Sequence, residues 1–309
     1  MLKFGRDVTD NPAGREFSRG AGRCREIQPE ITAKTSLVGV IGHPVAHSLS
    51  PQMHNASFAS RGLDFAYVAM DVAPEDLGEA VRGLAVLGFA GFNVTIPHKE
   101  EILRFLDDLD ESAERPGAVN TVVVEGGRTR GYNTDGFGFV ESCREAGVDL
   151  AGESVLVLGA GGAAAAIADA VVSAGASSVV IANRTPERAE ILVRRLRKGH
   201  AGAKIVACGA DDLYDACRRS RVLVNTTPLG MRQGDPMPLP EEVLEDRVVC
   251  DIVYRRGGET PLLSVARERG AAVVDGRTML LYQGVEAQRL WTGVEPDVEA
   301  MRAVLEEGG

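Results

Sequence analysis

The hydrophobic pattern of the first half of the chain alternates short apolar runs with stretches of helical spacing. Buried strands are predicted at 36–41, 65–70 and 88–95, where apolar residues cluster. Helices are predicted from Pro51 to a stop at Gly62, with Ser50 as N-cap, and over 74–87 and 97–106. Strands 118–124 and 129–133 enclose Glu-Gly-Gly-Arg, which is a hairpin signal.

This hairpin has a geometric consequence for two polar residues. An antiparallel return over the turn places Asn120 roughly opposite Asn133, and therefore beside Asp135. We expect Asn120 and Asp135 to point into one site. The antiparallel strands also predict that the sheet of this half is mixed.

The second half of the chain repeats strand and helix in regular alternation. Strands are predicted at 154–158, 179–182, 204–208, 221–225, 247–254 and 271–274. An Ala-rich helix closes near Gly175, and a second helix begins at Thr185 and Pro186. Such βαβ alternation predicts a doubly wound parallel sheet, and hence an α/β protein of two domains.

The composition agrees with this architecture, and the net charge limits the classes of partner that the protein could bind. A length of 309 residues with 44% hydrophobic content is enough for two cores. A net charge of -10 argues against nucleic acid or an anionic membrane as the main partner. An anionic small substrate remains compatible, because positive groups can gather inside a cleft.

The cellular location is predicted from the cysteine pattern and from the length of the apolar runs. Five cysteines, at 24, 143, 208, 217 and 250, are scattered without CxxC spacing, which favours a reducing cytoplasm. The sequence has no apolar run long enough for a membrane span and no signal-peptide core, so a soluble cytoplasmic protein is expected. Residues 1–35 lack an apolar period and are interpreted as a flexible leader. His43 and His47 lie in a loop with Pro44, so no metal site is expected.

A glycine-rich string follows the first strand of the second half. Gly159-Ala160-Gly161-Gly162-Ala163-Ala164 matches the fingerprint G-x-G-x-x-G/A, in which a tight turn brings backbone amides to a pyrophosphate at a helix start. Its place between a strand and a helix favours a dinucleotide site over a structural turn.

The end of the next strand predicts which dinucleotide binds. An NAD site expects an acidic residue about 20 residues beyond the loop, bonded to the ribose 2′-hydroxyl. This chain has Asn183-Arg184-Thr185 there, with Arg188 one helical turn further on. A guanidinium pairs with a 2′-phosphate, so the pattern predicts NADP; a solvated basic helix start is the alternative.

Lys99 and Asp135 are the candidate catalytic residues. Reduction of a ketone by hydride leaves an alkoxide that must be protonated, and a lysine can stabilise that charge or pass the proton. Asp135 would hold the ammonium in place, and which of the two is the formal acid or base stays open. The alternative is a surface salt bridge.

Polar side chains near the first and third strands are candidate substrate ligands. Ser48 and Ser50 precede a helix, whose N-terminus suits an anionic carboxylate, although a simple N-cap is the alternative for Ser50. Asn93 and Thr95 alternate with apolar residues in a buried strand. Buried polar groups need partners, so a ligand is one candidate partner.

These strings together resemble the shikimate dehydrogenase family. The resemblance rests on Asn93-Val-Thr-Ile-Pro-His-Lys99, Asn133-Thr-Asp135-Gly-Phe-Gly, the glycine loop and Gly42-His-Pro-Val-Ala-His-Ser-Leu-Ser-Pro51, and it runs from about Ser36 to the C-terminus. It implies reversible NADPH-dependent reduction of 3-dehydroshikimate to shikimate, a step toward chorismate and the aromatic amino acids. It also implies a mixed-sheet substrate domain (36–135 plus 276–309) and a Rossmann NADP domain (136–275), with C-terminal helices returning to the first.

The resemblance further implies roles for individual residues. It places Asn120, Tyr254 and Gln283 at the substrate, and Glu111, Ile252 and Gly276 near the cofactor. The string Asn-Arg-Thr-x-x-Arg, from Asn183 to Arg188, is implied to bind the 2′-phosphate. Two departures are visible: Ala164-Ala165 stands where relatives often have Ser-Arg, and Arg115-Pro116 precedes the strand to Asn120.

Two other functions are weighed against this one. A quinate/shikimate dehydrogenase with relaxed substrate or NAD use would prefer an acidic residue near position 183 and often replaces a substrate-contacting serine. A dinucleotide-sensing protein without turnover should lack the Lys99–Asp135 couple. The sequence leaves the oligomeric state open, with a homodimer as one possibility.

Overall fold

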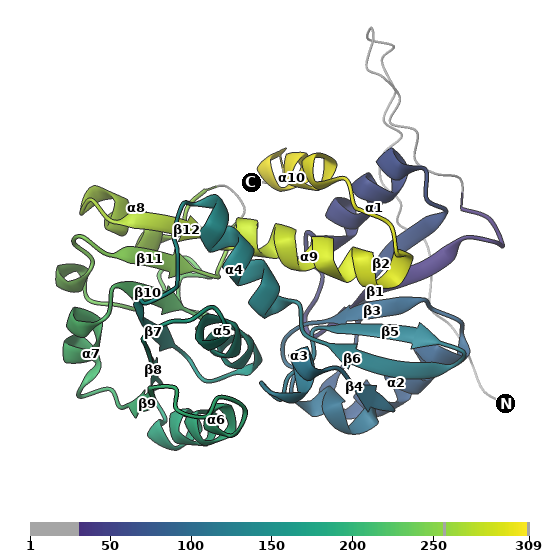
Figure 1. Cartoon of the computed structure of the whole chain (residues 1–309). Coiled ribbons are helices and arrows are strands. Elements are labelled where there is room, and N and C mark those ends of the chain that lie inside the picture. The colour runs from purple at the N-terminus through teal and green to yellow at the C-terminus, as the bar shows by residue number, and fades with distance from the viewer. Residues whose placement is uncertain (1–30, 256–257, 308–309) are drawn as a thin grey trace, which may run out of the picture.

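The computed structural model describes residues 31–255 and 258–307. The expected leader therefore lies for its greater part outside the described residues. Its last residues, 31–35, belong to no helix or strand, and 31–34 are exposed. The rest of the described chain forms two lobes, each built on its own sheet (Figure 1).

The first sheet has six strands in the order β2-β1-β3-β5-β6-β4. Its strands are β1 (Ser36–Gly42), β2 (Phe65–Asp71), β3 (Gly91–Val94), β4 (Asp108–Leu109), β5 (Thr121–Glu125) and β6 (Arg128–Tyr132). β1 pairs in parallel with β2 and β3, while β5 runs antiparallel to β3 and β6. The predicted mixed sheet is therefore confirmed.

The helices around this sheet correct two predictions. They are α1 (Ser50–Arg61), η1 (Pro74–Asp76), α2 (Leu77–Val86), η2 (Glu101–Phe105) and α3 (Glu111–Glu114). The helix predicted over 97–106 is wrong, because only the short 3₁₀ segment η2 forms and the carbonyl of Lys99 accepts from Val119 N at 2.8 Å instead. The prediction of Ser50 as N-cap is also wrong: Leu49 is the cap, and Ser50 is the first helical residue.

The second sheet is wholly parallel, with the order β12-β11-β10-β7-β8-β9. Its strands are β7 (Ser154–Leu158), β8 (Ser178–Ala182), β9 (Ile205–Cys208), β10 (Val222–Asn225), β11 (Val248–Asp251) and β12 (Ala272–Asp275). This is the strand order of dinucleotide-binding folds, in which the crevice opens where the order reverses, between β7 and β10.

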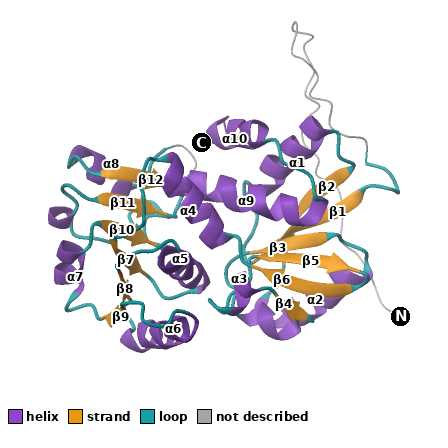
Figure 2. Ribbon diagram, viewed as in Figure 1, coloured by secondary structure: helices purple, strands orange, loops and turns teal. Residues whose placement is uncertain are grey.

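Helices cover both faces of the second sheet (Figure 2). α5 (Gly162–Ser173) and α6 (Pro186–Gly199) bury one face, while α7 (Leu213–Arg219), α8 (Pro261–Glu268) and the 3₁₀ segment η3 (Glu241–Val243) bury the other. Since both faces are covered, the central strands are largely apolar, as in Val155–Leu158.

Three helices join the lobes. α4 (Asp135–Glu145) leads from the first sheet to the second, and α9 (Gly276–Thr292) leads back and continues into α10 (Val298–Glu307). α9 packs against α4 and α1 and lies between the lobes in Figure 1. Leu281 and Trp291 of α9 enter cores built from α1 and the first sheet, so the predicted return of the C-terminal helices is confirmed.

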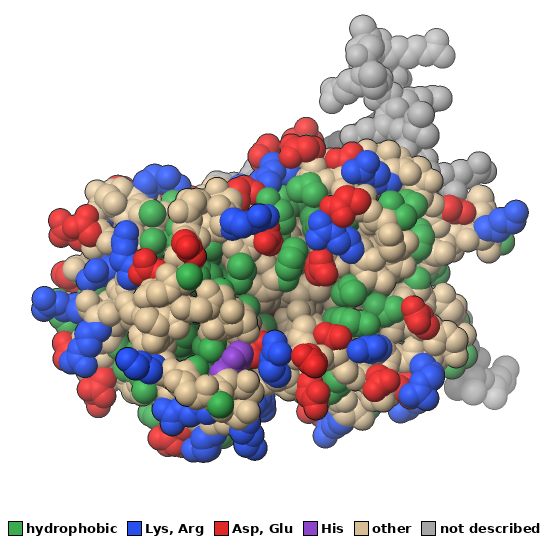
Figure 3. All heavy atoms as spheres, in the orientation of Figure 1, with side chains coloured by type: hydrophobic (Ala, Val, Ile, Leu, Met, Phe, Trp, Pro, Cys, Tyr) green, Lys and Arg blue, Asp and Glu red, His purple; other side chains and the backbone are tan. Residues whose placement is uncertain are grey.

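The surface has no dominant patch of one charge on the face seen in Figure 3, where basic and acidic side chains are interspersed over both lobes. In the part of the chain that the structure describes, no helix combines the length and apolar character needed to cross a bilayer.

Candidate active site

The site is built around an ion pair between Lys99 and Asp135. Nζ of Lys99 lies 2.5 Å from Oδ2 of Asp135, and the two side chains are 17% and 6% exposed. Lys99 lies in the loop after β3, and Asp135 is the first residue of α4, where the free N–H groups of the helix start favour a carboxylate. The two candidate catalytic residues thus face the same part of the molecule.

Asn120 holds the carboxylate from its other side. Nδ2 of Asn120 donates to Oδ1 of Asp135 at 2.9 Å. The hairpin register pairs Thr121 with Tyr132 and continues in a bond from Asn120 N to Tyr132 O at 3.1 Å. The prediction that the hairpin brings Asn120 beside Asp135 is therefore confirmed.

Asn93 is bonded by protein groups at both ends of its amide. Its Oδ1 accepts from the hydroxyl of Tyr67 at 2.7 Å. Its Nδ2 donates to the carbonyl of Asn120 at 3.1 Å and to Oγ1 of Thr121 at 3.0 Å. Protein groups therefore meet the hydrogen-bonding needs of this buried amide, and its burial does not by itself indicate a ligand.

The remaining predicted substrate residues surround the same group of side chains. Ser50 and Tyr254 both lie close to the hydroxyl of Tyr67. Oγ of Ser48 accepts from the N–H of Ser50 at 3.2 Å. Gln283 of α9 reaches Asn120 at 3.4 Å, so α1, β3, the hairpin, α9 and the loop after β11 all contribute.

Thr95 lies one position beyond the end of β3. Its side chain is half-buried, and a Cβ built on Gly42 would come within 2.3 Å of its Cγ2. Gly42 therefore leaves room for Thr95 at the edge of the loop that carries Ser48.

The glycine loop lies directly against Lys99. Gly159 has φ +125°, and a Cβ there would lie 2.3 Å from Oγ1 of Thr226, so only glycine fits the turn. A Cβ on Gly162, the first residue of α5, would lie 3.0 Å from Cβ of Lys99. The loop Gly159–Ala163 thus brings the N-terminus of α5 to the Lys99–Asp135 pair.

The predicted phosphate-binding residues follow β8. Asn183 Nδ2 donates to the carbonyl of Thr185 at 2.9 Å, which shapes the turn into α6. Arg184 and Arg188 are exposed, and neither forms an ion pair with any residue that the structure describes. Two guanidinium groups are therefore available to an anion at this strand end.

Ile252 and Gly276 meet at the ends of β11 and β12. A Cβ on Gly276 would lie 2.5 Å from the carbonyl oxygen of Ile252, so α9 can start here only with glycine. For Glu111, the contact that we find is with Arg115. Its carboxylate lies 3.5 Å from Nη1 of Arg115 and is 85% exposed.

A buried polar cluster at the ends of β10 and β11 was missed by the sequence analysis. Asp251 accepts from Thr260 Oγ1 at 2.6 Å, from Asn225 Nδ2 at 2.9 Å and from Val253 N at 3.1 Å. Burial raises the pKa of Asp251 to about 6. The available signal was the polar residue that closes each of these two apolar strands. The cluster fixes the loop that carries Ile252 and Tyr254.

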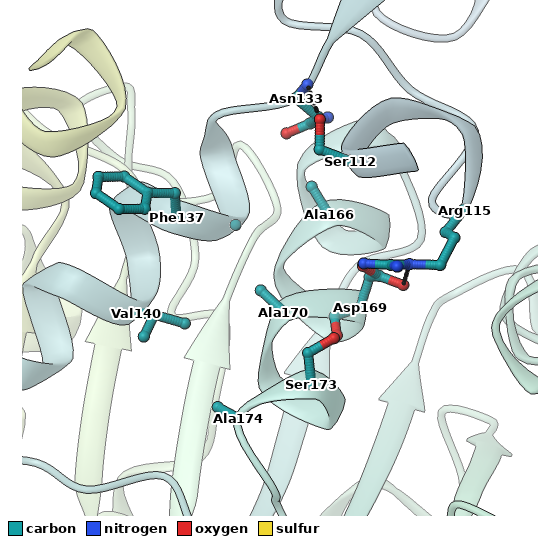
Figure 4. Close-up of a pocket in the computed structure, with 11 residues that line it drawn as sticks. Ser112, Arg115, Asn133, Phe137, Val140, Ala166, Asp169, Ala170, Ser173 and Ala174 are labelled. Carbon is teal, nitrogen blue, oxygen red and sulfur yellow. Dashed lines mark hydrogen bonds and ion pairs between the residues drawn. The ribbon is translucent and has the colours of Figure 1, made fainter. Parts of the chain in front are cut away.

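Arg115, one of the departures from the family pattern, bonds across the two lobes. Its Nη2 lies 3.2 Å from Oδ2 of Asp169 on α5, whose Oδ1 lies 2.7 Å from Nε2 of His200. Pro116 O accepts from Nη1 of Arg195 on α6 at 2.7 Å. Figure 4 shows Arg115 reaching Asp169 at a recess between α3, α4 and α5, none of whose lining residues is a predicted site residue.

No group of His, Cys, Asp or Glu side chains suited to a metal ion occurs within residues 31–255 and 258–307. His43 is bonded through Nδ1 to Asp71 at 2.7 Å.

A lysine–carboxylate pair held against the glycine loop of a doubly wound sheet is the arrangement of a dinucleotide-dependent oxidoreductase. Three family models match the chain: the shikimate dehydrogenase substrate binding domain at 40–122, shikimate/quinate 5-dehydrogenase at 141–229 and the shikimate 5′-dehydrogenase C-terminal domain at 276–306. The chain is 58% identical to the NADP⁺ shikimate dehydrogenase of Rubrobacter xylanophilus, over 91% of this chain and 99% of that protein. It is 50% identical to that of Moorella thermoacetica, over 90% and 95%.

Solved structures give the same result. A shikimate dehydrogenase in complex with NADP⁺ has a TM-score of 0.84 at 40% identity, covering 91% of this chain and 98% of that one. The Thermus thermophilus enzyme with NADP(H) and shikimate has 0.79 at 39%, covering 89% and 100%. A quinate dehydrogenase of Corynebacterium glutamicum with NAD has 0.82 at 34%, covering 88% and 99%. The chain belongs to the shikimate dehydrogenase family.

Proposed function

We propose that this protein is an NADP-dependent shikimate dehydrogenase, which reversibly reduces 3-dehydroshikimate to shikimate on the route to chorismate and the aromatic amino acids. The observation that carries the proposal is the Lys99–Asp135 pair, held 2.5 Å apart with the first residue of α5 against the lysine side chain. This arrangement sets a proton-transferring group beside a dinucleotide loop, as reduction of a ketone requires.

The residues around the pair are suited to a polyhydroxylated carboxylic acid. Ser48 and Ser50, at the start of α1, would take the carboxylate, because two hydroxyls and free helix N–H groups favour an anion. Amides and hydroxyls on the other elements would take the ring hydroxyls. These are Asn93, Thr95, Asn120, Tyr254 and Gln283, together with Lys99 and Asp135 themselves.

The cofactor residues fit NADP. The tight turn at Gly159 and the N-terminus of α5 offer backbone N–H groups to a pyrophosphate, through residues 159–163. Arg184 and Arg188, with Asn183 and Thr185 shaping their turn, offer charge to a 2′-phosphate. Ile252 and Gly276 would border the nicotinamide. Glu111 stays a prediction that the contacts at α3 do not support, since it pairs with Arg115.

When bound, the nicotinamide supplies or accepts the hydride at the alcohol carbon. Lys99 and Asp135 then act as one proton-transferring unit on the alcohol oxygen, with the ammonium stabilising the developing oxyanion. Asn120 orients the carboxylate of Asp135 through the 2.9 Å bond to Oδ1, which leaves Oδ2 for the lysine. Closely packed side chains on β3, β5 and α9 keep this pair largely away from water.

The domain limits, the cellular location and the oligomeric state are proposed together with the function. We propose a substrate domain of 36–135 plus 276–309 and an NADP domain of 136–275, a division that limited proteolysis would check. The four described cysteines, Cys143, Cys208, Cys217 and Cys250, are free and buried, which supports a cytoplasmic location. A homodimer stays a prediction that light scattering would check.

The test is a spectrophotometric assay of purified protein with shikimate and quinate, each against NADP and NAD. We expect turnover with shikimate and NADP, with much lower activity in the other three combinations. Comparable turnover of quinate, or a preference for NAD, would favour the quinate/shikimate dehydrogenase alternative. Binding of NADP without any turnover would favour a dinucleotide-sensing protein.

A further inference from the structure

Tyr67 lies in the middle of β2, where only 2% of the residue is exposed. Its hydroxyl nevertheless contacts two of the proposed substrate ligands, which come from different elements. It donates to Oδ1 of Asn93 at 2.7 Å, and Ser50 at the start of α1 lies close to it. Burial raises the pKa of Tyr67 well above its usual range, so the hydroxyl keeps its proton and remains a donor.

The bond from Tyr67 decides how the amide of Asn93 is turned. Nδ2 of Asn93 already donates to Asn120 O and to Thr121 Oγ1, which leaves Oδ1 facing Tyr67. Without the Tyr67 hydroxyl, that buried carbonyl oxygen would lose the donor that we find for it. The amide would then be held through Nδ2 alone, so its orientation would be less fixed and its contact with substrate would weaken.

Tyr67 itself is held firmly on its backbone and on its ring. Asn55 of α1 exchanges two bonds with its main chain, from Tyr67 N to Oδ1 at 2.8 Å and from Nδ2 to Tyr67 O at 2.9 Å. The ring stacks on His54, with centroids 4.5 Å apart and planes 8° from parallel. Trp291 packs 6.0 Å from it. A rigid ring of this kind gives the hydroxyl a fixed position.

We propose that Tyr67 is a positioning residue for the substrate: its hydroxyl orients Asn93, beside Ser50, for binding, without touching the reacting atoms. This inference rests on the proposed function, because it takes Asn93 and Ser50 as ligands of shikimate. Among the described residues, neither the glycine loop nor α6 supplies a partner of this hydroxyl, so the contacts proposed for NADP should be unaffected.

The test is the substitution Tyr67→Phe, which removes one oxygen and keeps the stacked ring. We expect the KM for shikimate to rise roughly 10- to 100-fold, the KM for NADP to stay within about twofold and kcat to stay within about threefold. Tyr282→Phe is the matched control. It also removes a phenol hydroxyl, which belongs to α9 and donates to Glu145 at the end of α4. This control should leave both Michaelis constants unchanged.

A structural role alone would not produce the expected pattern in the double variant. In an Asn93→Ala background, Tyr67→Phe should add less than about threefold to the shikimate KM, because most of the hydroxyl's effect passes through Asn93. Full additivity, a shikimate KM within twofold of wild type, or equal rises in both Michaelis constants would overturn the proposal.

Binding without turnover separates this inference from the proposed function. The chain has a single tryptophan, Trp291, which lies beside Tyr67, so its fluorescence gives the Kd for shikimate directly. Wild-type protein that binds shikimate but does not oxidise it contradicts the proposed function alone. Equal Kd values for wild type and Tyr67→Phe, or no binding by wild type, contradict the inference.

Discussion

The Lys99–Asp135 pair allows a catalytic role to be separated from a structural one. We consider Lys99→Met, Asp135→Asn and the double variant. Methionine keeps much of the length and the apolar stem of lysine, while asparagine keeps the shape of aspartate. Both single changes leave the partner without its counterpart, whereas the double variant leaves a neutral pair.

The expected magnitudes follow from burial. Lys99→Met leaves unpaired a carboxylate that is 6% exposed and that has, among the described residues, Asn120 as its one remaining side-chain donor. It should therefore lower the free energy of unfolding by about 3–5 kcal/mol. Asp135→Asn strands an ammonium that is 17% exposed and nearer to water, and should lower it by about 1–3 kcal/mol. The double variant should be destabilised less than Lys99→Met alone, since no buried charge remains.

Catalysis should respond differently from stability. Each single change should lower kcat by a factor of about 10²–10⁴, which corresponds to roughly 3–5 kcal/mol of barrier. The double variant should be no slower than the slower single variant, because residues that act as one unit are not additive. Thus stability should partly recover in the double variant while kcat does not.

Urea unfolding followed by far-UV circular dichroism measures the free energy of unfolding of each variant. Shikimate oxidation with NADP measures its kcat. Asp169→Asn is a useful comparison, because it breaks an ion pair outside the site whose carboxylate is buried. It should lower stability with little change in kcat. Near-normal kcat in Lys99→Met would refute the role given to this lysine, and additive stability losses would show that the two charges do not interact.

Three further predictions concern the cofactor, the pH and the turn. Arg184→Ala should raise the KM for NADP about tenfold or more with little change for NAD, because only NADP carries the 2′-phosphate; equal changes in steady-state kinetics would argue against that contact. Burial lowers the pKa of His54 from 6.5 to about 4, so its contribution to stability is complete above about pH 6.5 and is lost as pH falls toward 4. His54→Leu should therefore flatten the urea-unfolding profile in that window by about 3 kcal/mol; an unchanged slope would contradict this. Gly159→Ala should lower stability by about 1–3 kcal/mol and weaken NADP binding measured by calorimetry, since φ is +125° there; wild-type affinity would contradict the tight turn.

The sequence predicts best where local pattern and chain geometry agree. The Gly126-Gly127 turn and the period of its flanking strands fix the hairpin register, so the amino-acid order alone was enough to place Asn120 beside Asp135. The parallel sheet followed equally from the alternation of apolar runs. Both rest on short-range rules that tertiary contacts do not overrule.

Predictions failed where a distant contact decides the local conformation. Residues 97–106 have helical apolar spacing, yet the carbonyl of Lys99 bonds to Val119 and the segment forms only a 3₁₀ turn. No role was predicted for Tyr67, because nothing local reveals that its hydroxyl meets Asn93. Asp251 was missed for the same reason, since its partner Asn225 lies on another strand.

The path of α9 and α10 has a consequence for how the protein is made. Trp291 of α9 donates to the carbonyl of Val122 at 3.0 Å, and Met301 of α10 lies fully buried in the core that holds Met53. On the ribosome these helices emerge after the whole of the parallel sheet. The first sheet therefore has all its strands before the second begins, yet part of its apolar face is covered only after the second sheet has been synthesised.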